Sequence, residues 1–120
     1  MSLPYCNMGF SGRDFIIARR AMKDAEELQA AGHPKSALAA LKKPRSVLEK
    51  KVTPIRMLAL IHLQEAGLYL ELGKAGKALA SCKACESVLE AIGDEDEALK
   101  QTIQMTKDKA GQALQKESAA

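Results

Sequence analysis

The middle of the chain reads HLQEAGLYLELGKAGKAL over residues 62–79, and the fold can be inferred from this segment. Apolar residues recur at helical spacing before and after Gly73, and glycine is the residue type that most often ends an α-helix. Ala66 and Ala78 place small side chains where two antiparallel helices would approach each other, since bulky side chains there would hold the helices apart. The stretch therefore predicts a helical hairpin with its turn at Gly73.

An earlier part of the chain has the same arrangement. Four residues recur at a constant offset of 41 residues: Ala25 as Ala66, Leu28 as Tyr69, Gly32 as Gly73, and Ala37 as Ala78. Internal similarity at a period of this length is the signature of arrays of helical hairpins. We therefore expect two hairpins in tandem.

Capping and helix-breaking residues set the expected bounds of the elements. Ser11, Thr53 and Asp94 have the side chains that cap the start of a helix. Pro44 interrupts the second helix, because a proline inside a helix costs about 3 kcal/mol. The expected helices are 11–31, 34–43 with a kink or break near Lys43 and a short piece from 44 to about 50, 54–72, 74–92, and a fifth from 94 that frays near Ser118.

Composition supports an all-α fold. The good helix formers Ala, Leu, Lys and Glu are abundant, and aromatic residues make up only 3% of the 120 residues. We expect a single all-α domain of antiparallel helical hairpins at 11–117, with a flexible arm at 1–10 and a frayed tail at 118–120. The helix expected at 54–72 is apolar on most sides, which places it at the centre of the bundle.

Charge and hydropathy disfavour two classes of protein. The net charge of +3 is small and the charges of both signs are interspersed, whereas nucleic-acid-binding proteins usually concentrate their basic residues on one surface. The longest apolar stretch, 57–63, is too short to span a bilayer. Residues 1–10 lack the features of a signal peptide, so we expect a cytoplasmic protein.

The stretch from His62 to Leu89 resembles the tetratricopeptide repeat family. The matching positions are the small residue of the first helix, the large residue one turn later, the turn glycine, the early alanine of the second helix, and its later apolar and small positions: Ala66, Tyr69, Gly73, Ala78, Cys82 and Cys85. Two positions depart from the family pattern, since His62 stands in place of the usual tryptophan and Glu65 in place of a leucine. The resemblance implies two hairpins capped by a fifth helix.

The resemblance also implies a protein-binding scaffold whose first and third helices line a groove. Some members grip an acidic C-terminal tail with a clamp of Lys, Arg and Asn, but Met22, Glu26 and Leu60 occupy such positions here. We expect a non-catalytic adaptor that binds a partner segment, with no cofactor and no metal, because no catalytic or metal-ligand motif is present. The exposed residues expected to contact the partner are Arg19, Lys23, Glu26, Arg56 and Gln64.

Self-association is a further expectation. Repeat arrays usually need about three units before they are stable alone, and this chain offers two hairpins and a fifth helix. The missing burial would come from a homodimer, or from the rest of a larger protein if the chain is a fragment.

Two alternative functions remain open. A basic patch, formed by Lys42, Lys43, Arg45, Lys50 and Lys51, would suit a nucleic-acid-associated accessory protein. The Cys82–Cys85 pair would suit a thiol or metal switch, because cysteines three apart on a helix share a face. A closed zinc site would need two more ligands, and only Cys6, His33 and His62 are available. Both cysteines fall on the expected core face, so we expect buried structural thiols.

Overall fold

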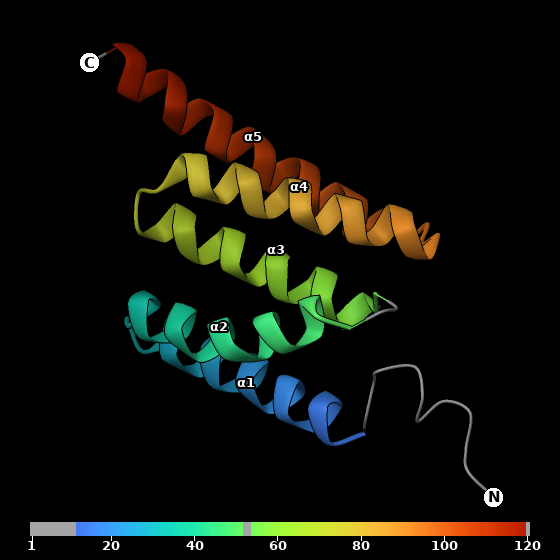
Figure 1. Cartoon of the computed structure of the whole chain (residues 1–120). Helices are drawn as coiled ribbons and strands as arrows, with labels where there is room; N and C mark the ends of the chain where they lie inside the picture. The colour runs from blue at the N-terminus through green and yellow to red at the C-terminus, as the bar shows by residue number, and fades with distance from the viewer. Residues whose placement is uncertain (1–11, 52–53, 120) are drawn as a thin grey trace, which may run out of the picture.

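The computed structural model describes residues 12–51 and 54–119, with side chains up to Lys116. These residues form α-helices and no strand, in the order α1 (Gly12–Ala30), α2 (Pro34–Glu49), α3 (Arg56–Glu71), α4 (Ala75–Ile92) and α5 (Glu97–Ala119). Figure 1 shows the helices stacked in chain order, each antiparallel to the one before it. The expected all-α fold of helical hairpins is confirmed.

The turns inside the two hairpins have the same geometry. Gly32 and Gly73 adopt positive φ values of 86° and 74°, a conformation that glycine reaches at little cost because it has no Cβ atom. In both turns the glycine N–H and the N–H of the following residue donate to carbonyls of the last helical turn: Gly32 to Gln29 at 3.0 Å, His33 to Leu28 at 2.8 Å, Gly73 to Leu70 at 3.1 Å, and Lys74 to Tyr69 at 2.8 Å. This is the Schellman pattern. The repeat of sequence is thus also a repeat of structure.

The turn between α4 and α5 corrects one expected cap. The N–H of Asp94 donates to the Leu89 carbonyl at 2.9 Å and so completes the end of α4. The side chain of Asp94 accepts a hydrogen bond from the Asp96 N–H at 3.0 Å, and Asp96 Oδ1 accepts one from the Leu99 N–H at 3.1 Å. Asp96 therefore caps α5, and the expectation that Asp94 would do so is wrong, because its backbone still belongs to the end of α4.

Of the kink or break expected near Lys43, the break is wrong. Helix α2 continues through Pro44 to Glu49. Pro44 is buried on the same face as Leu41 and Leu48, at the spacing of three and four residues that aligns side chains on a helix. Tertiary packing of this face compensates for the hydrogen bond that a proline cannot make.

Smaller differences concern the helix ends. Helix α3 begins at Arg56 with Ile55 as an extended N-cap, two residues later than expected. Helix α5 includes Ser118 and continues to Ala119, where we expected a frayed tail. The expected caps Ser11 and Thr53, and the arm at 1–10, lie outside the described residues.

Helix α3 is the centre of the core. On one side Leu58, Ile61 and Leu68 join a cluster with buried residues of α1 and α2. On the other side Ala59 and Ala66 pack with buried residues of α4 and α5. A helix with two buried sides must be apolar on most of its circumference, as the sequence predicted.

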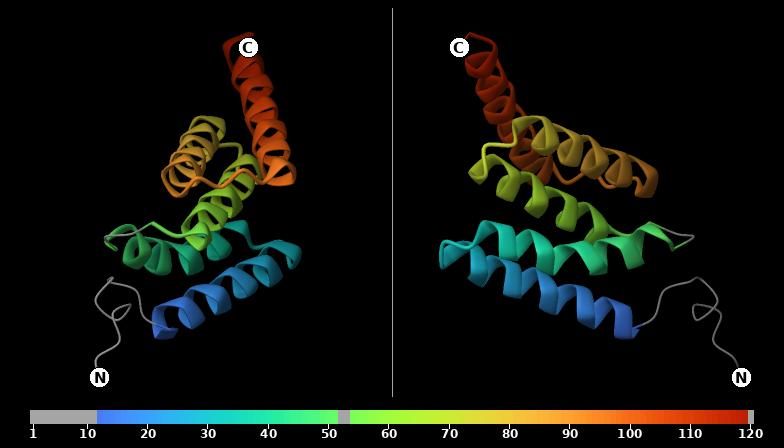
Figure 2. Two further views of the ribbon diagram at one scale, coloured as in Figure 1. Left: turned by 90° about the vertical axis from the view of Figure 1, so that its right-hand side faces the viewer. Right: turned by 60° about the vertical axis from the view of Figure 1, so that its left-hand side comes forward.

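Helix α5 closes the stack and extends past it. Both views in Figure 2 show its C-terminal end beyond the ends of the other helices. Leu99 and Ile103 pack against α3 and α4, and Ala110 packs against Ala75 and Ala78 near the start of α4. Within the described residues, no helix combines the length and the hydropathy that a membrane span requires.

Candidate functional site

One flank of α3 is only partly covered by its neighbours. Leu60, Gln64 and Gly67 are half-buried and Glu71 is exposed, and their spacing places all four on one stripe of the helix. We call this stripe the α3 face. Helices α1 and α5 both pack against α3, while the described parts of α1 and α5 do not approach each other. The α3 face is therefore a surface that α3 shares with α1, the first helix of the other hairpin.

The five residues expected to contact a partner do not form one site. Arg19, Lys23 and Glu26 are exposed on α1, and the Arg19 guanidinium lies 5.9 Å from the centre of the Phe15 ring. Arg56 is held at the far end of α3, where its guanidinium bonds to Asp94 and, at 2.8 Å, to Asp96. Arg56 therefore fixes the turn that begins α5 rather than standing free for a ligand.

Gln64 belongs to the junction between α1 and α3. Its Nε2 donates to the carbonyl of Met22 at 2.8 Å. Its Oε1 is buried and has no hydrogen-bond partner among the described residues. An unpaired buried acceptor is unfavourable, so Gln64 marks a place where the α1–α3 junction is incompletely satisfied. The residue lies on the α3 face, as expected, but its amide is used to hold two helices together.

The basic patch is divided by the fold. Arg45 bonds to Glu49 at 3.0 Å and to Glu65 at 2.9 Å, and Lys51 pairs with Asp14 at 2.8 Å. The other members of the patch, Lys42, Lys43 and Lys50, are exposed. Two of the five cations are therefore already neutralised by carboxylates of this chain.

The cysteine pair is buried, as expected. Cys82 and Cys85 are free thiols with no exposed surface. Burial raises the pKa of both thiols, to about 12 for Cys85, so neither is a thiolate at neutral pH. No group of three or more His, Cys, Asp or Glu side chains in the described part of the chain is placed to hold a metal ion. Cys6 lies outside the described residues.

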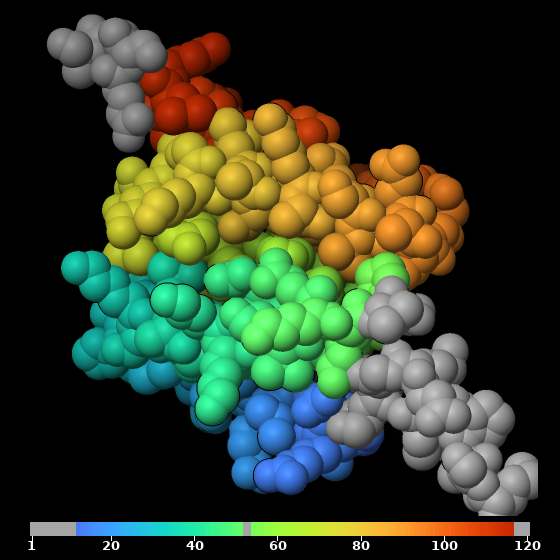
Figure 3. All heavy atoms as spheres, in the orientation of Figure 1, coloured from blue at the N-terminus to red at the C-terminus, as the bar shows by residue number. Residues whose placement is uncertain are grey.

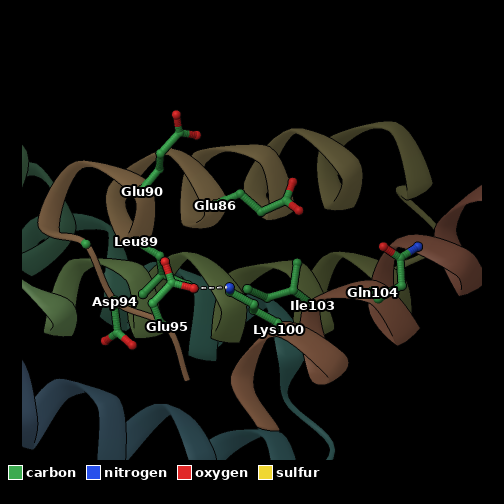
Figure 4. A pocket seen from close by; sticks show the side chains of 9 residues that line it. Glu86, Leu89, Glu90, Asp94, Glu95, Lys100, Ile103 and Gln104 are labelled. Atoms are coloured by element: carbon green, nitrogen blue, oxygen red, sulfur yellow. Dashed lines mark hydrogen bonds and ion pairs between the residues drawn. The ribbon is translucent and has the colours of Figure 1, made fainter. Parts of the chain in front are cut away.

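A cavity of about 440 Å³ lies between α4 and α5. Figure 4 shows its floor of Leu89 and Ile103, with Glu95 and Lys100 facing each other at its mouth. The charged groups around it are mostly paired with each other: Lys100 with Glu95 at 2.6 Å, Lys107 with Glu86 at 3.2 Å, and Arg56 with Asp94. The carboxylate of Glu90 points away from Lys100. These pairs tie α4, α5 and their turn together.

A buried polar cluster lies on the opposite flank of α3. His62 and Glu65 are 7% and 4% exposed, and His62 Nδ1 lies 3.8 Å from Glu65 Oε1. Burial lowers the pKa of His62 and raises that of Glu65, and the Arg45 guanidinium partly offsets the second effect. Sequence reasoning noticed both residues as departures from the family pattern but did not place Arg45 against them. An ion pair was nevertheless predictable, because a carboxylate on a central apolar helix requires a cation and the basic patch is close in sequence.

Comparison with known proteins gives no further assignment. No protein-family model, curated protein or solved structure matches this chain significantly.

Proposed function

We propose that this chain is a tetratricopeptide-like, non-catalytic adaptor that binds a segment of another protein along the α3 face. The observation that carries the proposal is the structural repeat of the two hairpins. Ala25 and Ala66, and likewise Ala37 and Ala78, are fully buried at equivalent places around turns of equal geometry. Equivalent hairpins stacked side by side form an extended surface, which is how helical repeat proteins present a binding site.

The α3 face has the composition of a docking surface. Leu60 offers partly exposed apolar area, and Gly67 leaves the backbone uncovered. A Cβ atom added at Gly67 would meet nothing within 4 Å, so the space above this glycine is open to a partner side chain. Arg19 and Glu26 are exposed on α1 one turn before and after Met22, whose carbonyl bonds to Gln64 of the α3 face, so charged groups would border an apolar centre.

A pair of glycine variants tests the proposal. Gly67→Arg places a long charged side chain on the α3 face without a clash. Gly76→Arg makes the same change on the exposed start of α4, where an added Cβ is equally free of contacts. Tagged wild type and both variants are used to capture proteins from a native lysate, with and without nuclease. A protein that is retained by wild type and by Gly76→Arg, but lost with Gly67→Arg, supports the adaptor.

The same experiment covers the alternative function. Capture that disappears with nuclease, or that is equally strong for both variants, contradicts binding at the α3 face. In the first case the exposed lysines of the basic patch would be responsible, since counterion release at phosphates drives such binding. The internal pairing of Arg45 and Lys51 makes this the weaker proposal.

We also propose that the chain forms a homodimer through the outer side of the first hairpin. Ile16 and Ile17 are 61% and 49% exposed. Ile17 also lines a mainly apolar cavity of about 210 Å³ with Pro44 and Val47 of α2. In a repeat array this side of a hairpin packs against the preceding unit. A second copy of this chain would cover the same apolar surface.

A further inference from the structure

A cleft separates α2 from α4 on the side of α3 that faces away from Gly67. Among the described residues the backbones of α2 and α4 do not approach each other, and Figure 3 looks onto this side of the molecule, with α3 visible between them. The cleft contains two cavities of about 230 Å³ and 180 Å³, both lined by Arg45, Glu65 and Tyr69. Small side chains on the facing flanks, such as Ala39 and Ala80, leave this space unfilled.

The cleft contains more positive than negative charge. Lys42 of α2 and Lys77 of α4 line it, one from each side. Neither lysine forms an ion pair with a carboxylate of the described residues. The carboxylate that lines the cleft is that of Glu65, which accepts a hydrogen bond from Arg45 at 2.9 Å. Two cations are therefore left without a counter-charge at a surface that is partly enclosed.

Two hydroxyl groups in the cleft have no partner. Ser81 is only 9% exposed and lines the larger cavity with Tyr69. Neither hydroxyl forms a hydrogen bond with another described residue. Ser81 Oγ is not among the buried side-chain atoms that lack a partner, so solvent reaches this oxygen and both hydroxyls can donate to a group that occupies the cavity. The ammonium of Lys77 lies 5.8 Å from the centre of the Tyr69 ring, which fixes both side chains at the same wall.

We propose that the α2–α4 cleft binds a phosphate-sized oxyanion, held by Lys42 and Lys77 with the hydroxyls of Tyr69 and Ser81. The donors belong to three different helices: Lys77, Ser81 and Tyr69 line the larger cavity, and Lys42 and Tyr69 line the smaller one. This spread suits the several oxygens of a tetrahedral anion better than the two coplanar oxygens of a carboxylate. Phosphate carries a charge close to −2 at neutral pH, which matches the two unpaired lysines. Lysine recognises phosphate as a point charge and needs no fixed planar geometry.

Glu65 does not prevent this binding. Its carboxylate is only 4% exposed and is directed to the Arg45 guanidinium, so the pair presents little net negative charge to the cavity. Arg45 also bonds to Glu49, which keeps its guanidinium beside the floor of the cleft. The site is independent of the proposed adaptor function, because residues 65 and 69 lie on the opposite flank of α3 from Gly67.

The test is a titration with inorganic phosphate followed by ¹H–¹⁵N NMR, with chloride replaced at constant ionic strength. We expect saturable shifts at the amides of Tyr69, Ser81 and Ala84. The Lys42→Gln/Lys77→Gln double variant should weaken binding by roughly tenfold or more, because charge-assisted hydrogen bonds are the stronger class. The matched control is Lys43→Gln/Lys83→Gln, which removes one exposed lysine from each of the same two helices but leaves the cleft intact.

Ser81→Ala is a second, milder variant. It removes the hydroxyl that lines the larger cavity and introduces a good helix former, so the fold is retained while phosphate binding weakens. A parallel titration with an N-acetyl phosphoserine amide identifies the source of the anion. Saturation by both ligands, or by either alone, supports the oxyanion site and shows whether the phosphate is free or attached to a side chain. The proposal is overturned if neither ligand saturates the cleft, or if the control double variant weakens binding as much as the cleft double variant.

Discussion

His62 and Glu65 are the most unusual residues of α3, since they are ionisable groups buried on the central helix. Burial disfavours the charged form of both, so the pKa of His62 is lowered and that of Glu65 is raised. Arg45 supplies the cation that offsets the cost of burying the Glu65 carboxylate. The sequence placed these residues on a helix that is otherwise apolar, and the fold explains them as one wall of a polar cleft.

The stability of the protein should depend on His62 below neutral pH. The unfolded chain protonates His62 near a pKa of about 6.5, whereas the folded chain does so only at lower pH. Between these values the unfolded state binds the extra proton, so the free energy of unfolding falls as the pH drops below about 6.5. His62→Gln should reduce the loss of stability between about pH 7.5 and about pH 5.5. Glu65 has the opposite effect on the free energy of unfolding. Because its pKa is raised in the folded state, the folded state binds the proton first as the pH falls, and stability rises.

Urea denaturation at several pH values measures this effect. His33→Gln is the control, since His33 is the exposed histidine of the chain. If His62→Gln loses as much stability on acidification as wild type does, burial of His62 is not the cause.

Glycine substitutions should change stability in opposite directions. Gly67 lies inside α3 with open space around its Cα, so Gly67→Ala should raise the free energy of unfolding by up to about 1 kcal/mol. Gly73 has a φ of +74°, and an alanine there should cost about 1–2 kcal/mol. Denaturant melts of the two variants check the prediction. A neutral result for Gly73→Ala would mean that the turn does not need the left-handed conformation.

For the helices and turns, short-range sequence patterns predicted the hairpins, whereas features that depend on tertiary contacts could not be predicted. The turns at Gly32 and Gly73 were predictable because a Schellman turn depends on neighbouring residues only. The continuity of α2 was not, since it depends on the burial of Pro44 against other helices. The α2–α4 cleft escaped prediction for the same reason: Lys42 and Lys77 are far apart in sequence, and only packing places them at two cavities that share Arg45, Glu65 and Tyr69.

Pro44 lowers the intrinsic stability of helix α2, and the size of this effect can be measured with a Pro44→Ala variant. Pro44→Ala restores a backbone N–H and removes the clash with the preceding turn, a change worth about 3 kcal/mol in a helix interior. It also removes two buried methylenes from the ring, which costs about 1.6 kcal/mol. We expect a net gain of about 1 kcal/mol in the free energy of unfolding by urea titration. Destabilisation instead would show that the fit of the ring outweighs the lost hydrogen bond.

The cap of α5 gives a similar test. Asp96→Ala should lower the free energy of unfolding by about 1 kcal/mol, because the Leu99 N–H loses its acceptor. Asp94→Ala should also destabilise, since its side chain holds the Asp96 N–H. Glu95→Ala is the matched control, because the Glu95 side chain is 80% exposed and, among the described residues, its ion pair is with Lys100. Equal effects of Asp96→Ala and Glu95→Ala would contradict the assignment of the cap.

In the whole molecule, the outer side of the first hairpin exposes apolar surface at Ile16 and Ile17. This is the surface that we propose a second copy of the chain buries. Ile17→Glu places a charge on this surface and should convert the proposed homodimer to a monomer in sedimentation velocity runs at micromolar concentrations. Met105 on α5 is a further large apolar residue with an exposed side chain, 60% exposed, and Met105→Glu should leave the oligomeric state unchanged. A wild-type chain that sediments as a monomer under these conditions contradicts the dimer.

The central claim is that a partner binds along the α3 face. Photo-crosslinking tests it most directly, with benzoylphenylalanine introduced at Gly67 in one chain and at Gly76 in another, since both sites have room for a side chain. We expect that a protein captured from native lysate becomes crosslinked from position 67 and not from position 76. Crosslinking from position 76 alone, or no crosslink at 67 while the partner remains bound, would contradict it.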